Sequence, residues 1–323
     1  MLRSASLPSL GALPSLRQLR YLVVLAERLN FRAAAEACFV TQSTLSAGIK
    51  ELESQLDAHL VERDRRSVRL TRLGAQVVER ARRLIAEAGD LVATARAGRE
   101  PLSGPFRLGV IPTIAPFLLP AALPPLRERF PKLRLYLRED LTARLLEQLR
   151  AGRLDAALIA LPFDTGELEI HELFRDEFWF VARADDPLAK PKAVAIERLD
   201  VNDVILLEEG HCLREHAITA CGDARDSSSS GDIEATSLPT LLQMVEGGLG
   251  VTLLPEIAIK AGVLNATNLI ARPFSTRVPA RTLALAARPS SARGKDLGLL
   301  AEFLSQRRQR PGIPALRRGR KSA

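Results

Sequence analysis

The sequence predicts a small helical head with helix-turn-helix spacing, a long connecting helix and an α/β body. Apolar residues follow helical spacing with two breaks between residues 16 and 53, and a continuous amphipathic stretch follows from residue 74. Beyond residue 104, short apolar runs alternate with helical patterns. We therefore expect five segments: an N-terminal extension (1–15), the head (16–73), the connecting helix and hinge (74–104), the body (105–306) and a basic disordered tail (307–323).

Length and composition limit the class of protein. The 323 residues suffice for two or three domains, and 46% of them are hydrophobic, enough for a sizeable core. No run of eighteen apolar residues appears, so no membrane partner is expected. The first residues lack the apolar block of a secretion signal, and three cysteines are too few for a disulfide-built extracellular scaffold. We expect a cytoplasmic protein with reduced thiols and no cofactor.

The net charge of +8 is unevenly distributed along the chain. Residues 1–104 carry 16 Lys and Arg against 11 Asp and Glu, whereas residues 105–304 carry 23 against 27. A basic head on an acidic body is typical of a polyanion-binding module joined to a part with another task. Residues 305–323 add seven basic side chains and no acidic ones, which suits either a solubilising end or non-specific nucleic-acid contact.

The head has the pattern of a helix-turn-helix. A short helix over residues 31–37 is followed by a turn over residues 39–41, in which Thr41 can cap a third helix over residues 42–53. Such proteins place the start of the third helix in the DNA major groove. The candidate residues are Gln42, Ser43, Thr44 and Ser46 for base edges, and Arg32 and Lys50 for phosphates.

These motifs resemble the winged helix-turn-helix of LysR-type transcriptional regulators. The resemblance is carried by residues 31–37 (FRAAAEA), 40–46 (VTQSTLS) and 49–53 (IKELE). Residues 60–71 (LVERDRRSVRLT) stand where that family has its wing, which implies Arg65 and Arg66 as further DNA contacts. Two features depart from the family pattern. Many members have Pro at the position of Ser43, and Gly48 inside the recognition helix costs about 1 kcal/mol of helix propensity.

The connecting helix, expected from Gly74 to Gly98, carries a coiled-coil seam. Its apolar residues alternate at spacings of four and three: Val77, Ala81, Leu84, Ala88, Leu91 and Ala95. Such a seam either packs on the chain's own body or pairs with a second copy. The resemblance implies self-pairing, because the linker helices of the family dimerise and present two heads to a twofold-symmetric DNA site. It also implies tetramers, although nothing in the residues decides between two copies and four.

The body reads as strands alternating with helices, which predicts parallel sheets with covering helices. The expected strands are 107–111, 133–137, 156–160, 178–182, 204–207, 251–254 and 282–286, and the expected helices are 116–130, 142–151, 236–247 and 295–308. The family resemblance implies two lobes like those of a periplasmic binding protein. Lobe I would contain residues 105–176 and 277–306, and lobe II residues 177–276. Ligands of such folds bind at the carboxyl ends of the strands.

Two cysteines stand nine positions apart in the run GHCLREHAITAC (residues 210–221). His211 and Arg214 flank Cys212 and can favour its thiolate, the form that oxidants attack. If residues 213–220 are helical, the ends of the run lie roughly 13 Å apart. A disulfide requires Cα atoms within about 7 Å, so joining Cys212 to Cys221 would force the segment to refold. The Ser-rich loop at 227–231 would supply slack.

This region resembles the hydrogen-peroxide sensors within the LysR family. The resemblance covers nearly all of residues 16–305 and is carried by residues 111–113 (IPT), the cysteine run, 235–238 (ATSL) and 250–255 (GVTLLP). It implies that Cys212 reacts with peroxide and Cys221 resolves it into a disulfide. It further implies peroxide-binding roles for Thr113, Thr142 and His211, and support of the thiolate by Arg281 and Arg214. The implied partners are double-stranded DNA, RNA polymerase, hydrogen peroxide, further copies of the chain and a cellular thiol reductant.

Other functions are compatible with parts of the pattern. A regulator of the same fold would bind a small organic effector between the lobes, and a thiol peroxidase would turn over peroxide with an incidental head. Cys212, Cys221, His211 and His216 are zinc-ligand types, but their spacing is not that of a zinc site, so no metal is expected. No Ser-His-Asp, Walker or dinucleotide-binding motif appears, so an enzyme is not expected. Cys38 is expected to be a small buried residue.

Overall fold

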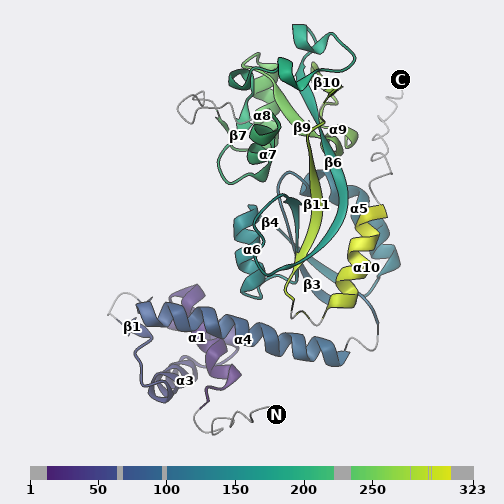
Figure 1. Ribbon diagram of the computed structural model, residues 1–323. Helices are drawn as coiled ribbons and strands as arrows, with labels where there is room; N and C mark the ends of the chain where they lie inside the picture. Colours follow the sequence, from purple (N-terminus) through teal and green to yellow (C-terminus); the bar gives the residue numbers. More distant parts are fainter. Residues whose placement is uncertain are drawn as a thin grey trace, which may run out of the picture. The chain divides into compact units, whose positions relative to one another are not determined.

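The computed structural model describes residues 13–63, 68–96, 100–221, 234–276, 278–289, 291 and 293–306. The chain divides into two compact units, one that runs through Arg96 and one that contains nearly all of the rest (Figure 1). Several sequence expectations lie outside the described residues. They concern most of the N-terminal extension, Arg65 and Arg66, the Ser-rich stretch and the basic tail.

The first unit contains the three predicted head helices: α1 (Leu16–Arg28), α2 (Phe31–Cys38) and α3 (Gln42–Gln55). Side chains cap all three helices. Ser15 forms a capping box with Gln18, Asn30 accepts from the Ala33 amide, and Thr41 accepts from the Thr44 amide at 3.2 Å. The prediction that Thr41 begins the recognition helix is therefore confirmed.

A two-stranded antiparallel wing follows the helices. Its strands are β1 (Val61–Arg63) and β2 (Val68–Leu70), with Val61 opposite Leu70. The Glu53 carboxylate, near the end of α3, accepts from the amides of Leu60 and Val61 at 2.8 and 3.1 Å. This carboxylate ties the recognition helix to the first wing strand, so the winged helix-turn-helix implied by the family resemblance is present.

The glycine inside α3 has a packing explanation. A Cβ atom at Gly48 would lie 2.8 Å from Cδ2 of Tyr21, a ring on α1 that is only 5% exposed. Because the ring belongs to the head core, it has little room to move. Glycine at this position permits close contact between α1 and α3.

We expect Gly48→Ala to destabilise the head by about 1 kcal/mol. The added methyl overpacks against Tyr21 at a cost of about 1–3 kcal/mol, which outweighs the gain of about 1 kcal/mol in helix propensity. Gly298→Ala is the matched control, because no heavy atom lies within 4 Å of a Cβ there and only the propensity gain applies. Urea unfolding of the full-length chain measures both variants. Stabilisation by both would contradict the packing explanation.

The connecting helix α4 (Arg72–Arg96) has two different halves. Val78 and Ala81 are buried in the head core, and α1 lies alongside this part of the helix (Figure 1). Farther along, Leu84, Leu91 and Val92 are 49%, 72% and 47% exposed. Part of the amphipathic stripe therefore packs on the chain's own head, and pairing of the exposed half with a second copy stays a prediction.

The second unit is built on a seven-stranded sheet with the order β10-β6-β11-β5-β3-β4, in which β9 also pairs with β6. Its strands are β3 (Gly104–Val110), β4 (Leu133–Glu139), β5 (Ala156–Leu161), β6 (Glu169–Arg183), β9 (Thr252–Pro255), β10 (Leu269–Pro273) and β11 (Ala280–Ala287). Within this sheet, as described, parallel pairing is confined to β3, β4 and β5, so the prediction of parallel sheets is wrong for β6, β9, β10 and β11. Two neighbouring parallel strands must be joined by a long crossover connection, usually a helix. β6 and β11 instead carry the chain to and from the second lobe in opposite directions.

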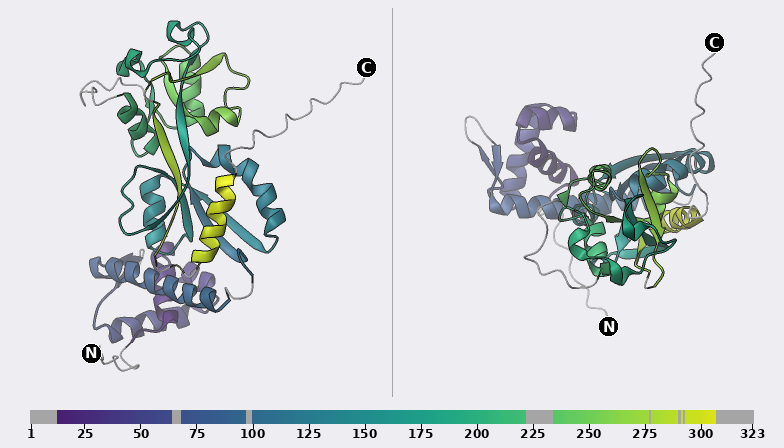
Figure 2. Two further views of the ribbon diagram at one scale, coloured as in Figure 1. Left: turned by 45° about the vertical axis from the view of Figure 1, so that its right-hand side comes forward. Right: turned by 90° about the horizontal axis from the view of Figure 1, so that it is seen from above.

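Two lobes share the long strand β6. Its first half pairs with β11, and from Phe178 onward it pairs with β9 and β10. Each lobe has its own apolar core. In lobe I, α5 (Ala115–Arg129) and α10 (Gly294–Ser305) lie on one side of the strands and α6 (Thr142–Arg150) on the other (Figures 1 and 2). The two-lobed α/β fold is thus confirmed.

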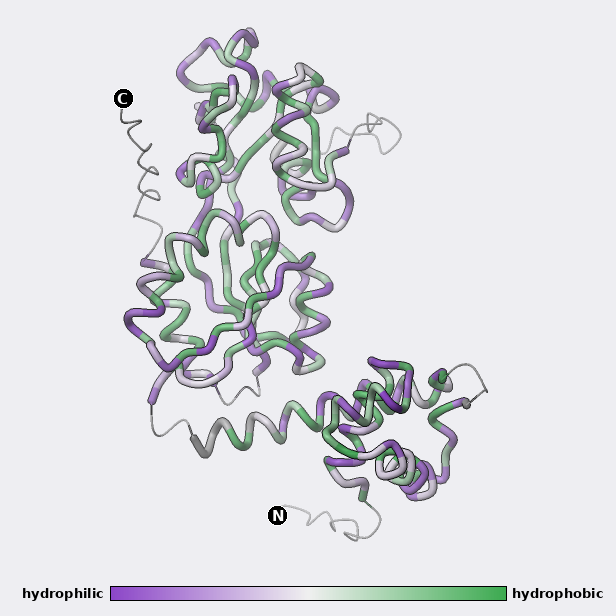
Figure 3. Tube along the Cα trace, turned by 180° about the vertical axis from the view of Figure 1, so that it is seen from behind, coloured by the Kyte–Doolittle hydropathy of each residue, from purple (hydrophilic) through white to green (hydrophobic). Residues whose placement is uncertain are grey.

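Lobe II contains the short parallel strands β7 (Leu206–Leu207) and β8 (Glu234–Ala235) and the helices α7 (Cys212–Cys221), α8 (Leu238–Glu246) and α9 (Glu256–Lys260). The strands at the centre of both lobes are predominantly hydrophobic (Figure 3). Within the described part of the chain, no helix is long and apolar enough to span a membrane.

Candidate functional site

Cys212 is the first residue of α7 and lies where the two lobes meet. Gly210, just before the helix, has a left-handed φ of +93°, which lets the chain turn sharply into α7. The Cys212 side chain is 5% exposed and packs with the core of lobe I, whereas Leu213 and Ala217 of the same helix pack with the core of lobe II. Helix α7 is therefore held by both lobes.

The backbone of α7 keeps the ends of the cysteine run apart. Residues 212–221 form one continuous helix, which meets the condition set in the sequence analysis, and Cys212 is a free thiol. Nine helical steps span about 13 Å, nearly twice the Cα separation of about 7 Å that a disulfide tolerates. A bond from Cys212 to Cys221 therefore requires at least part of α7 to unwind.

Opposing influences act on the Cys212 thiol. Burial raises its pKa, while the Arg281 guanidinium and the hydroxyls of Thr142 and Thr113 lower it. The position of the thiol at the N-terminus of a helix also favours negative charge. Thr142 Oγ1 is buried and has no partner in hydrogen-bonding geometry among the described residues. This hydroxyl is available to a small polar molecule.

Arg281 lies at the centre of a buried polar network. Its Nε donates to Asp176 Oδ2 at 3.0 Å, and its two terminal nitrogens donate to the side chain and carbonyl of Thr113 at 2.8 and 3.0 Å. Neither charged side chain has exposed surface. Burial raises the pKa of Asp176, although Arg281 and the Ile257 amide both favour its carboxylate. Sequence reasoning missed Asp176, because it is the middle one of three consecutive charged residues, Arg175, Asp176 and Glu177, and nothing in the local sequence marks it as the buried one.

His211 and Arg214, the sequence neighbours of Cys212, have other partners. The His211 ring is 4.0 Å from the Glu208 carboxylate and hydrogen-bonds the backbone of Thr236. Arg214 donates to the Leu207 carbonyl at 3.1 Å and to Glu234 at 2.6 Å, which joins β7 and β8. The structure thus brings Thr113, Thr142 and Arg281 to the thiol, whereas the contacts of His211 and Arg214 lie elsewhere. The functional roles of all five residues stay predictions.

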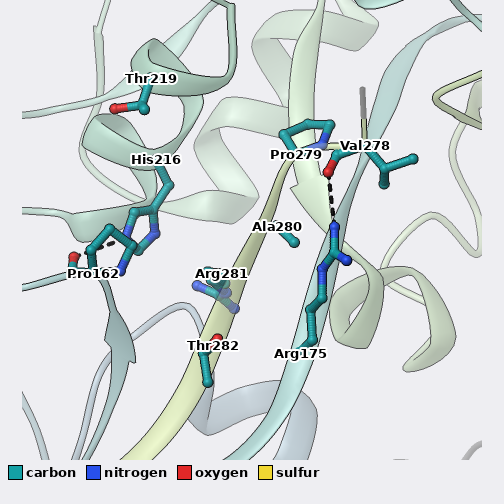
Figure 4. A pocket seen from close by; sticks show the side chains of 9 residues that line it. All are labelled: Pro162, Arg175, His216, Thr219, Val278, Pro279, Ala280, Arg281 and Thr282. Atoms are coloured by element: carbon teal, nitrogen blue, oxygen red, sulfur yellow. Dashed lines mark hydrogen bonds between the residues drawn. The ribbon is translucent and has the colours of Figure 1, made fainter. Parts of the chain in front are cut away.

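A cavity of about 400 Å³ opens beside the network. Its lining residues are Pro162, Arg175, His216, Thr219 and residues 278–282, which lead into β11 (Figure 4). The His216 ring approaches the Pro162 carbonyl at 3.2 Å through Nε2, while its buried Nδ1 has no partner in the described chain. Sequence reasoning considered His216 only as a zinc-ligand type, expected no metal there, and assigned this residue no other role.

In the head, the four residues predicted to contact base edges lie in the first turns of α3, whereas Lys50 lies farther along this helix and Arg32 on α2. Gln42, Ser43, Thr44 and Lys50 are exposed, Ser46 is half-buried, and Arg32 on α2 is exposed and paired with Glu36 at 3.2 Å. The hydroxyls of Ser43 and Thr44 lie 2.9 and 2.8 Å from Thr41 Oγ1, so they also belong to the helix cap.

Comparison with known protein families agrees with both units. Residues 16–75 match the bacterial regulatory helix-turn-helix of the LysR family, and residues 99–309 match the LysR substrate-binding domain. The chain belongs to the LysR family. As a LysR-type protein, it is a DNA-binding transcriptional regulator.

The curated relatives of this LysR-type regulator include two functional groups. The transcriptional regulator EstR of Acinetobacter baylyi is 45% identical over 92% of this chain and 98% of its own. The transcriptional dual regulator OxyR of Escherichia coli K12 is 38% identical over 91% of this chain and 95% of its own. A probable hydrogen peroxide-inducible genes activator of Streptomyces viridosporus is 39% identical over 91% and 94%.

Solved structures of OxyR proteins share the LysR-type architecture. A full-length OxyR variant from Pseudomonas aeruginosa aligns with a TM-score of 0.76 at 36% identity, covering 91% of this chain and 98% of its own. An H₂O₂-bound OxyR variant from Corynebacterium glutamicum aligns with a TM-score of 0.63 at 32% identity, covering 91% and 92%.

The regulator is expected to lose stability as pH falls below about 6.5. Burial holds the pKa of both His211 and His216 below the ordinary value, so the unfolded chain binds protons that the folded LysR-type body excludes. Their contribution is full above the unfolded pKa of about 6.5 and is lost below it, at up to about 1.4 kcal/mol per pH unit for each ring. Urea unfolding between pH 7.5 and 5.5 measures the slope. His216→Gln should flatten it, and His59→Gln, at an exposed head position, should not.

Proposed function

We propose that this LysR-type regulator senses hydrogen peroxide through Cys212 and changes transcription when Cys212 and Cys221 form a disulfide. The observation that carries the proposal is the setting of Cys212, at the N-terminus of a helix and acted on by Arg281, Thr113 and Thr142. A structural cysteine needs none of these groups. Similarity to OxyR proteins, one of them with bound H₂O₂, supports the same oxidant.

The chemistry requires two steps. The Cys212 thiolate attacks one peroxide oxygen, the O–O bond breaks, and the departing hydroxide takes a proton to become water, which leaves a sulfenic acid on Cys212. The Cys221 thiolate then attacks the Cys212 sulfur, and the sulfenic hydroxyl leaves as a second water when it is protonated. Thr142 and Thr113 can donate to the oxygens during the first step. A cellular dithiol restores both thiols by exchange.

Oxidation alters transcription because α7 is held by both lobes. The disulfide favours a state in which α7 is at least partly unwound, so contacts of Leu213 and Ala217 with lobe II and of Cys212 with lobe I change together. This change alters how copies pair within a dimer or tetramer, and with it the spacing of the DNA-binding heads and their contact with RNA polymerase. The exposed half of α4 supplies an apolar surface for that pairing.

DNA binding in this proposal uses α3 and the wing. The exposed residues Gln42, Ser43 and Thr44 read base edges, while Lys50 and Arg32, with the wing arginines Arg65 and Arg66, contact phosphates. We expect Lys50→Ala to weaken binding to all DNA sequences about equally and to reduce the slope of log K against log salt by about 1 for each head. A change confined to one base position would contradict a phosphate contact.

The deciding experiment is mass spectrometry of the full-length protein after brief exposure to micromolar peroxide and rapid thiol blocking. A Cys212–Cys221 cross-link at one disulfide per chain is expected, together with altered protection of promoter DNA. Recovery of both cysteines as free thiols would refute peroxide sensing by this pair. Sustained peroxide consumption with a thiol reductant would instead indicate a thiol peroxidase.

A second candidate function is regulation by a small organic effector. The cavity near His216 favours it, since the unpartnered Nδ1 and the Arg281 guanidinium are groups that a carboxylate or phenol would bind. An effector-driven regulator would keep inducible DNA binding after Cys212→Ser, whereas a peroxide sensor would lose it.

A further inference from the structure

We infer that Asp176 is a positioning residue that acts on Cys212 through Arg281 and Thr113. By holding the guanidinium in one orientation, Asp176 directs the Thr113 hydroxyl proton toward the Cys212 sulfur. The inference deepens the proposed function and rests on it for the role of Cys212. It concerns how the reactive thiolate is prepared before any oxidant arrives.

The first step is the anchoring of Asp176. It stands directly opposite Arg281 in the antiparallel pairing of β6 and β11, and both side chains are fully buried. One carboxylate oxygen accepts from Arg281 Nε at 3.0 Å, and the other accepts from the Ile257 amide of α9 at 3.0 Å. Glu256 is the other acid that acts on this carboxyl. Asp176 is thus held by hydrogen bonds to both oxygens and cannot turn freely.

The second step is the orientation of Arg281. A guanidinium is planar, so a hydrogen bond at Nε sets the directions of the terminal N–H groups. Both terminal nitrogens point at one residue, where Nη1 donates to Thr113 Oγ1 at 2.8 Å and Nη2 donates to the Thr113 carbonyl at 3.0 Å. This bidentate contact holds both the backbone and the side chain of Thr113, which lies three residues after the carboxyl end of β3.

The third step is the direction of the Thr113 proton. An arginine only donates, so the Thr113 oxygen must accept in that contact, and its own proton remains to be donated elsewhere. The Thr113 hydroxyl lowers the pKa of the Cys212 thiol, so we assign the Cys212 sulfur as the acceptor of that proton. Without the fixed guanidinium, the hydroxyl could turn and accept from the thiol, which would favour the neutral form.

If Asp176 acted on Cys212 only through its negative charge, its effect on the thiol pKa would be opposite to that of positioning. A carboxylate near a thiol disfavours the thiolate, so its removal should lower the thiol pKa and speed the thiol's reactions. Loss of positioning should instead raise the thiol pKa and slow them. A purely structural role would lower the stability of the fold and leave the thiol pKa unchanged. The three roles are therefore distinguishable in one measurement.

The test is the pH dependence of Cys212 alkylation by iodoacetamide in the full-length reduced protein, with the Cys212 peptide quantified by mass spectrometry. The midpoint of the pH–rate profile reports the thiol pKa independently of access to the buried sulfur. For Asp176→Asn we expect the midpoint to rise by about one pH unit and the rate at pH 7 to fall about tenfold. An unchanged or lower midpoint would overturn the inference.

A double-variant cycle tests the route through Thr113. Thr113→Val should raise the midpoint by itself, and adding Asp176→Asn should change it by less than about a third of the single effect. An undiminished effect of Asp176→Asn in the Thr113→Val background would also overturn the inference. Asp296→Asn is the matched control, since Asp296 pairs with Arg293 at 3.7 Å and accepts from the Leu102 amide in lobe I. It should leave the alkylation profile unchanged.

If Asp176→Asn does not fold, Asp176→Glu serves in its place. It retains the charge but moves the carboxylate by one methylene, so the same direction of shift is expected, and no shift would refute positioning. The alkylation assay contains neither peroxide nor DNA. If the alkylation midpoint shifts as expected but peroxide forms no disulfide, only the proposed sensing function is refuted. If the disulfide forms but the midpoint is unchanged in both Asp176 variants, only the positioning role of Asp176 is refuted.

Discussion

Cys212→Ser is expected to abolish the change in promoter binding that peroxide causes, while the variant keeps the DNA affinity of the reduced protein. Serine has nearly the size of cysteine and fits the buried position, but its hydroxyl is not oxidised by peroxide under these conditions. The position is buried, with 5% of the side chain exposed, and the two side chains are nearly equal in size. The substitution should therefore preserve α7 and the fold. Footprinting of promoter DNA with and without peroxide measures the response.

Cys38→Ser is the control for this experiment. Cys38 is also buried and free, but it lies in the head, and burial raises its pKa with only Arg20 opposing. Its thiol therefore lacks the hydroxyl groups that surround Cys212, and the variant should respond to peroxide normally. A full response in Cys212→Ser, or its loss in Cys38→Ser, would contradict the assignment of the reactive thiol.

Arg281→Met is expected to lower the stability of the body by about 3–5 kcal/mol. The substitution leaves Asp176 buried without its charge partner, which is the costly half of breaking a buried ion pair. It also removes the donor to Thr113, so alkylation of Cys212 at neutral pH should slow in parallel. Urea unfolding and the alkylation rate measure the two effects on the same sample.

The double variant Arg281→Met with Asp176→Leu separates these effects. Replacing both charges by apolar groups removes the uncompensated carboxylate and should recover most of the lost stability. It should not recover the reactivity of the thiol, because no group then orients Thr113. Recovery of both the stability and the alkylation rate of Cys212 would show that Arg281 serves stability alone. Recovery of neither would show that apolar side chains do not repack at this site.

The local sequence is a good guide wherever neighbouring residues decide the structure. Thr41 followed by the apolar spacing of residues 42–53 predicts the cap and length of the recognition helix, since both depend on side chains within one or two turns. The helical reading of residues 213–220 is likewise local. The separation of the two cysteines follows from helix geometry alone, before any packing is known.

The local sequence was a poorer guide to which charged side chains lie near the Cys212 thiol. His211 and Arg214 flank Cys212, yet α7 begins at the cysteine, and the contacts of Arg214 with Leu207 and Glu234 hold it at the β7–β8 junction. The guanidinium that acts on the thiol comes from residue 281, far along the chain. Arg214 follows Cys212 by two positions in α7, and side chains two positions apart in a helix do not face each other.

From its residues alone, this chain can be recognised as a helix-turn-helix head with an α/β body and a cysteine pair that a helix keeps apart. Those properties depend on spacing over a few turns. The antiparallel course of β6 and β11, the burial of Asp176 against Arg281 and the aim of Arg281 at Thr113 became evident only in the folded protein. They join residues 113, 176 and 281, and only tertiary packing brings positions so distant into hydrogen-bonding contact.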